Sequence, residues 1–168
     1  MIIDGRALAE KIKFALAPKF KPYLPVRLEV ILVGEDSASL KFVAIKERFG
    51  AAIGVDVRRH EFSQDVLVEE VEDLLQRLTV DPQSQGIIIQ LPLPAHLKSE
   101  ELLKFIPATK DVDVLTATAC VLSPVAGAVA EILTSEKIKL SGIRAVVVGK
   151  GRLVGQPVAV WLTKAGAQ

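Results

Sequence analysis

A run of three isoleucines between Gly86 and Gln90, followed by two prolines, constrains the fold more than any other segment. The run is too short and too rich in β-branched residues for a helix, so it predicts a buried strand. Pro92 and Pro94 cannot donate backbone hydrogen bonds, and the strand should therefore end near Gln90. Open α/β sheets bind ligands at the carboxyl ends of their strands, which is where Gln90 falls. The segment is either one wall of a binding site or a strand followed by a simple proline-rich connector.

The segments around this run alternate between strand-like and helix-like patterns. Strands are predicted at residues 27–33, 55–62 and 86–90, and helices at about 6–20, 37–52, 66–78 and 99–106. Asp4 is placed to cap the first helix, on which Leu8, Ile12 and Leu16 form one apolar stripe. Strands joined by helical crossovers form a parallel, doubly wound sheet with helices on both faces. The predicted fold class is therefore α/β, with three layers.

A second unit is predicted to begin after Asp113. The Ser123-Pro124 pair is a good helix start and leads into a helix to about Thr134. An apolar strand at 145–148, a glycine-rich turn and a helix at about 154–165 follow. This order matches the start of a Rossmann-like unit. The boundary is expected between 114 and 123, which gives predicted domains at 1–118 and 119–168.

Composition excludes several classes of function. The 21 basic and 20 acidic residues give a net charge of +1, so electrostatics provide no case for a nucleic-acid partner. No run of about 18 apolar residues without charge occurs, and no membrane partner is expected. Cys120 is the single cysteine and cannot form an internal disulfide, which fits a reducing compartment. The amino terminus lacks the pattern of a signal peptide, so a cytoplasmic location is expected.

Four motifs occur together in a specific order. They lie at residues 33–46, 86–94, 110–113 and 149–157. In order and spacing they resemble the bifunctional methylenetetrahydrofolate dehydrogenase/cyclohydrolase family, and the resemblance extends from Ile2 to the end of this shorter chain. It implies a folate-binding catalytic domain followed by the start of a Rossmann-like NADP-binding domain. It also implies two reactions: NADP-dependent oxidation of methylene-tetrahydrofolate to methenyl-tetrahydrofolate, and hydrolysis of that product to formyl-tetrahydrofolate, in one-carbon metabolism and purine biosynthesis.

The resemblance also implies roles for individual residues. Lys46 would be the central catalytic residue, Gln90 its partner, and Asp113 the residue that binds the pterin. The substrate-binding set would be Ser39, Phe42, Leu91, Pro92 and Asp113. A partly buried lysine can transfer protons near neutral pH, and a carboxylate can accept two hydrogen bonds from an N–H/NH₂ edge. Without the resemblance, Lys46 could be a solvated charge beside a ring, and Asp113 a residue that caps a loop.

Phe42 departs from the family pattern, because tyrosine is usual at this position. Phenylalanine keeps the surface that stacks on a flat substrate but lacks the hydroxyl group. Binding is therefore expected to survive better than turnover. Lys41 adds a positive charge nearby.

The glycine-rich turn between the predicted strand and helix is the expected cofactor site. The implied cofactor-binding residues are Gly149, Lys150, Gly151, Arg152 and Gly155. The two positive charges favour NADP over NAD, although a tight strand-to-helix connection would need the same glycines. A residue that recognises the ribose is expected about 20 residues after the turn, at or beyond Gln168. The cofactor site is thus expected to be incomplete within one copy of this chain.

Three functional hypotheses follow. The first is an enzyme of folate metabolism in which cyclohydrolase activity is retained better than dehydrogenase activity. The second is a catalytically impaired folate-binding or interface remnant of the same family. The third is a fragment of an unrelated NAD(P)-dependent dehydrogenase. The high apolar content and a mean hydropathy of +0.37 also predict a homodimer through residues 140–165, with exposed apolar faces at 146–148 and 158–162.

Overall fold

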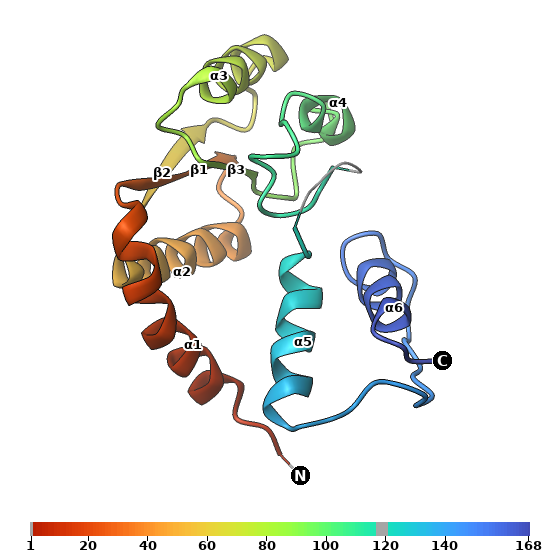
Figure 1. Ribbon diagram of the computed structural model, residues 1–168. Helices are drawn as coiled ribbons and strands as arrows, with labels where there is room; N and C mark the ends of the chain where they lie inside the picture. The colour runs from red at the N-terminus through yellow and green to blue at the C-terminus, as the bar shows by residue number, and fades with distance from the viewer. Residues whose placement is uncertain (1, 117–120) are drawn as a thin grey trace. The chain divides into compact units, whose positions relative to one another are not determined.

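The computed structural model describes residues 2–116 and 121–168 (Figure 1). The described residues divide into two units, 2–112 with Thr116, and 113–115 with 121–168. Cys120 and the predicted boundary at 118/119 lie outside the described residues. Among the described residues, no helix is long and apolar enough to cross a membrane.

A parallel three-stranded sheet forms the centre of the first unit. Its strands are β1 (Val26–Val33), β2 (Val55–Phe62) and β3 (Gly86–Ile89), in the order β2-β1-β3. The crossover from β1 to β2 passes through α2 (Ser37–Ile53), and that from β2 to β3 through α3 (Val68–Val80). These helices lie on opposite sides of the sheet, with α4 (Ser99–Leu103) on the α3 side (Figure 1). The predicted α/β fold with three layers and a doubly wound parallel sheet is confirmed.

The central strand β1 is buried over its second half, Val30 to Val33. Val30 and Leu32 of β1 pack with Ile88 of β3 and Val43 of α2 on one face of the sheet. On β1, Glu29 points to the other face, where it is only 1% exposed and its Oε2 lies 2.7 Å from His60 Nε2. A buried carboxylate needs such partners, because desolvation otherwise disfavours its charge. The pattern of apolar residues gave no indication of this pair.

The first helices show how local sequence sets the element boundaries. Asp4 caps α1 (Gly5–Phe20), accepting from the backbone N–H groups of Arg6 and Ala7 at 3.0 Å each, as predicted. The α1 helix lies against α2 and is followed by a 3₁₀ turn, η1 (Lys21–Tyr23). The α2 helix ends at Gly54, whose φ of 86° favours glycine. A Cβ there would also approach Leu24 Cδ1 to 2.9 Å.

The second unit contains α5 (Pro124–Ser135) and α6 (Gly155–Lys164), which pack through a small apolar cluster of Ala126, Val158, Leu162 and Ala167. Ser123 caps α5 through its side chain, as its sequence suggested. The expected exposed face at 158–162 is therefore wrong at its two ends, since Val158 and Leu162 are buried. Between them, Val160 is exposed.

The predicted strand at 145–148 is not a strand within the described part of the second unit. Only its start is paired: Ala145 N donates to the Gln168 carbonyl, and Gln168 N donates to the Ile143 carbonyl, both at 2.8 Å. A strand needs a continuous hydrogen-bonded neighbour, and the pairing here stops after these bonds. Val147 packs on the apolar cluster, whereas Val146 and Val148 are 88% and 96% exposed.

We predict that the Asp36 cap of α2 makes stability depend on pH. A hydrogen bond from the backbone N–H of Ser39 is the main cause that lowers the pKa of Asp36 below its ordinary value of 3.8. Because this pKa is lowered in the folded state, the stabilisation is present above 3.8 and is lost as the pH falls through the folded value. Urea midpoints of the wild type and Asp36→Asn, which retains a cap without the charge, should converge as the pH falls.

The matched variant is Asp36→Ala, which removes the cap. It should be less stable than Asp36→Asn at every pH. A difference between wild type and Asp36→Asn that persists unchanged in acid would contradict this account of the cap.

Candidate active site

Lys46 and Gln90 meet on one side of the sheet. Lys46 is a half-buried residue of α2, and Gln90 follows the last residue of β3. Lys46 Nζ donates to Gln90 Oε1 over 3.0 Å. The predicted approach of these side chains is confirmed, although their sequence positions are 44 residues apart.

The backbone of Gln90 is held by the sheet, and its side chain by the following peptide. Gln90 N donates to the Ile31 carbonyl at 2.9 Å, which extends the β1–β3 ladder by one bond. Gln90 Nε2 donates to the Leu91 carbonyl, also at 2.9 Å. The same carbonyl accepts from Ser39 Oγ at 3.3 Å. Both ends of the Gln90 amide are therefore occupied.

Four other residues of the predicted substrate-binding set are close in sequence to Lys46 or Gln90, and their side chains differ in exposure. Phe42, one helical turn before Lys46, is 59% exposed and so offers a ring face to a ligand. Ser39 is 2% exposed, Leu91 is half-buried and Pro92 is exposed. The Leu91–Pro92 peptide bond is cis.

A cleft of about 410 Å³ lies at the carboxyl ends of β1 and β3. Its lining joins the segment after β1 to the proline segment after β3, and comprises Val33, Gly34, Glu35, Asp36, Gln64, Pro92, Leu93 and Pro94. This is the edge at which open α/β sheets bind ligands. The predicted role of the proline segment as a site wall remains a prediction, but the segment does border a cleft.

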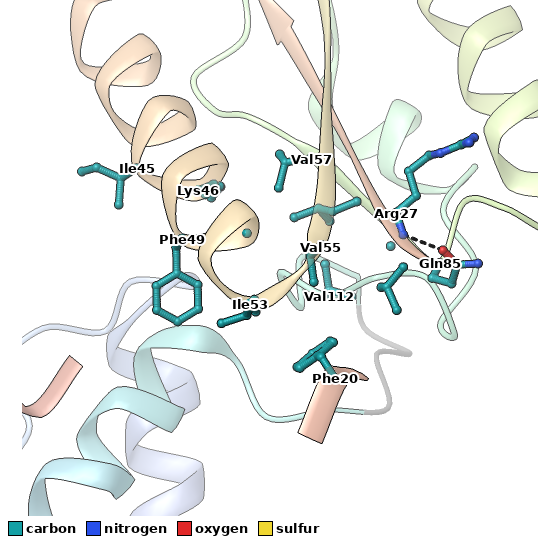
Figure 2. A pocket seen from close by; sticks show the side chains of 14 residues that line it. Phe20, Arg27, Ile45, Lys46, Phe49, Ile53, Val55, Val57, Gln85 and Val112 are labelled. Atoms are coloured by element: carbon teal, nitrogen blue, oxygen red, sulfur yellow. Dashed lines mark hydrogen bonds between the residues drawn. The ribbon is translucent and has the colours of Figure 1, made fainter. Parts of the chain in front are cut away.

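A second cavity, of about 420 Å³, lies near the amino ends of the strands (Figure 2). Lys46 is part of its lining, which is otherwise dominated by apolar side chains such as Phe20, Phe49, Ile53, Val55 and Val57. This cavity was not predicted from the sequence. Phe49 and Ile53, four residues apart on one helical face, were the available signal.

Two residues of the 110–113 motif have structural roles that sequence reasoning missed. Asp111 is 2% exposed, and its Oδ2 accepts from Thr116 N at 2.8 Å and from Thr116 Oγ1 at 2.7 Å. Lys110 Nζ donates to the carbonyls of Leu78 and Asp81 at 2.9 and 2.8 Å, at the end of α3. Asp113 itself is half-buried and falls in the second unit, so its role at the pterin remains a prediction.

The glycine turn before α6 has the geometry of a close backbone approach. Gly149 has a φ of 109°, and a Cβ at Gly155 would collide with the Gly149 carbonyl. Gln156 N donates to the Gly151 carbonyl at 3.1 Å, which tightens the turn. Lys150, Gly151 and Arg152 are exposed. The turn and its two cations therefore fit a dinucleotide phosphate at the start of a helix.

No group of three or more histidine, cysteine, aspartate or glutamate residues in the described ranges could hold a metal ion. What these features define is a doubly wound α/β protein with a lysine–glutamine pair beside its sheet and a phosphate-type turn in a second unit.

Comparison with known proteins identifies the family to which the chain belongs. The catalytic-domain model of the tetrahydrofolate dehydrogenase/cyclohydrolase family matches residues 3–113. Bifunctional FolD proteins of Rubrobacter xylanophilus and Bdellovibrio bacteriovorus are 37% and 35% identical over 99% of this chain, which covers 63% of each. The chain belongs to the tetrahydrofolate dehydrogenase/cyclohydrolase family, and it spans about 63% of the length of these curated relatives.

Solved structures agree with this placement. The bifunctional FolD enzyme of Campylobacter jejuni matches with a TM-score of 0.94 and 31% identity, over 98% of this chain and 64% of that one. The FolD enzyme of Trypanosoma brucei, solved with NADP cofactor and inhibitor, matches with a TM-score of 0.92 and 29% identity, over 99% and 62%. The hypothesis of an unrelated dehydrogenase fragment is therefore wrong.

We predict that Asp111→Ala destabilises the first unit by about 1–3 kcal/mol, the usual cost of leaving a buried donor unsatisfied. Among the described residues, the affected donors include the N–H and hydroxyl groups of Thr116. Asp111→Asn is the matched control, since its amide oxygen can still accept from Thr116. Urea unfolding monitored by circular dichroism measures both. Equal losses for the two variants would show that the Thr116 contacts do not stabilise this loop.

Proposed function

We propose that this chain binds tetrahydrofolate derivatives and hydrolyses methenyl-tetrahydrofolate to formyl-tetrahydrofolate. The observation that supports this most directly is the 3.0 Å contact between Lys46 Nζ and Gln90 Oε1 in a chain of this family. A neutral amide can orient an amine without itself adding the compensating negative charge that a carboxylate would bring. Such an amine is suited to proton transfer beside a cationic substrate.

Each residue of the proposed site has its own role in folate binding or in hydrolysis. Phe42 stacks on the flat part of the folate, Leu91 and Pro92 border it, and Asp113 accepts hydrogen bonds from the pterin edge. Water adds to the carbon of the methenyl bridge, which opens as its carbon–nitrogen bond breaks. Lys46 assists the proton transfers, and Gln90 keeps its ammonium group in place.

For the second reaction, oxidation of methylene-tetrahydrofolate, we propose NADP as the cofactor. When bound, this group accepts the hydride from the methylene carbon. Gly149, Gly151 and Gly155 would let the backbone approach its phosphates, and Lys150 and Arg152 would offset their charge. In this proposal, residues 1–118 form the folate-binding catalytic domain and 119–168 an incomplete NADP-binding domain.

The cellular setting is part of the same proposal. The formyl product would supply purine biosynthesis in the cytoplasm. A second candidate function is a folate-binding protein without turnover, and the absence of a hydroxyl group at Phe42 favours it.

The experiment that tests the main proposal assays both reactions on the purified 168-residue chain. We expect methenyl-tetrahydrofolate hydrolysis without robust NADP reduction, because hydrolysis needs the folate site and water alone. Lys46→Met should lower the hydrolysis rate at least about 10²-fold, the scale of a positioned acid–base group. Lys41→Met is the matched control, because Lys41 is an exposed lysine on the same helix.

Three outcomes would redirect the interpretation. Unchanged hydrolysis in Lys46→Met would remove this lysine from the mechanism. Robust NADP reduction by the chain alone would contradict the incomplete cofactor site. Folate binding without either reaction, measured by calorimetry, would favour the non-catalytic candidate.

We also propose a homodimer to which residues 140–165 contribute. Support comes from Val146 and Val148, which have highly exposed side chains and belong to an incompletely paired segment. Val146→Lys with Val148→Lys should lower the oligomeric order in light scattering at micromolar concentration. Lys139→Glu is an exposed control nearby. Val147 and Trp161 are unsuitable for this test, because they pack on the apolar cluster and their substitution would also affect folding. A monomeric wild type would refute the dimer.

A further inference from the structure

Ser39 occupies a buried position between α2 and the segment after β3. It lies in the first turn of α2, where its backbone N–H donates to Asp36 Oδ2 at 2.7 Å. Its hydroxyl donates to the carbonyl oxygen of Leu91, 52 residues away in sequence, over 3.3 Å. With 2% of its surface exposed, the serine offers little area to a ligand.

The hydroxyl has one proton to donate. It donates this proton to the Leu91 carbonyl over 3.3 Å, while the backbone N–H of the same serine donates to Asp36 Oδ2 at 2.7 Å. The hydroxyl therefore joins the start of α2 to the Leu91 peptide.

The Leu91 carbonyl links Ser39 to the candidate catalytic pair. A carbonyl oxygen has two lone pairs, and here it accepts from Ser39 Oγ and from Gln90 Nε2. The other end of the Gln90 amide accepts from Lys46. An ammonium group can only donate and a backbone carbonyl can only accept. The Gln90 amide consequently has a single satisfactory orientation, with its oxygen toward Lys46.

We propose that Ser39 is a positioning residue that acts through the Leu91 carbonyl and Gln90 on Lys46. Its hydroxyl fixes the direction of the carbonyl, the carbonyl fixes the amide of Gln90, and the amide oxygen fixes the ammonium group. This role differs from direct contact with the substrate. It rests on the proposed hydrolysis for its kinetic consequences, but the hydrogen-bonded chain can be tested without turnover.

The first test does not depend on activity. The side-chain NH₂ resonances of Gln90 are observed by ¹⁵N NMR in wild type, Ser39→Ala and Ser37→Ala. Ser37 is an exposed serine in the same helical turn and is the matched control. Ser39→Ala should shift these resonances and speed their exchange with water, whereas Ser37→Ala should leave them in place. Unchanged resonances in Ser39→Ala overturn the proposal, even if the chain proves to have no hydrolase activity.

The second test uses hydrolysis kinetics. Ser39→Ala should lower kcat about 10-fold with little change in KM, because a displaced acid–base group slows the chemical step more than binding. Ser39→Cys, or Ser39→Thr if it folds with an unchanged urea midpoint, should recover part of the loss. A raised KM with unchanged kcat would instead show direct substrate contact and overturn the positioning role.

A double-mutant cycle separates positioning from a general structural effect. In a Gln90→Ala background the link to Lys46 is already broken, so adding Ser39→Ala should lower kcat no further. Losses that multiply in the double variant would mean that Ser39 acts independently of Gln90, which contradicts the proposal. If wild type hydrolyses no substrate, the proposed function fails, and the NMR comparison alone decides the role of Ser39.

Discussion

The pairing of β3 with the central strand β1 determines where the candidate site can form. The last bond of this ladder, from Gln90 N to the Ile31 carbonyl at 2.9 Å, places the glutamine where β3 ends. The α2 helix packs on β1 through Val43, and this packing sets the height of Lys46 above the sheet. A shift of the β1–β3 register by one residue would turn the isoleucines to the wrong faces and move Gln90 away from the lysine.

Several buried polar groups of the first unit have hydrogen-bonding partners, and some of these partners lie far apart in sequence. Glu29 lies against His60 and the Leu91 carbonyl accepts from Ser39, 31 and 52 positions away, whereas Asp111 is paired with Thr116, five positions further along the chain. The first two contacts join segments that the sheet and its crossovers bring together. Burying such groups without partners costs free energy, so these contacts restrict the loops at the carboxyl edge to few arrangements.

In the second unit, a segment with a strand-like pattern lacks a complete hydrogen-bonded neighbour. Residues 145–148 alternate correctly for a strand, with Val147 packed and Val146 and Val148 exposed, but only the start of the segment is hydrogen-bonded. The glycine turn before α6 nevertheless keeps the conformation that its glycines allow, because Gly149 and Gly155 are required locally. The conformation of the turn depends on local residues and is therefore present, although the segment before it lacks most of the backbone hydrogen bonds of a strand.

The sequence by itself determined the family of this chain and most elements of its first unit. Hydrophobic periodicity and the capping residue Asp4 predicted these helices and strands close to their observed bounds, because such signals act over a few positions. Only the tertiary structure decided that Ser39 is buried against Leu91, that Glu29 pairs with His60, and that Val158 is covered. These outcomes depend on which distant segments become neighbours, and a local pattern of residues has no information about a partner 31 or 52 positions away.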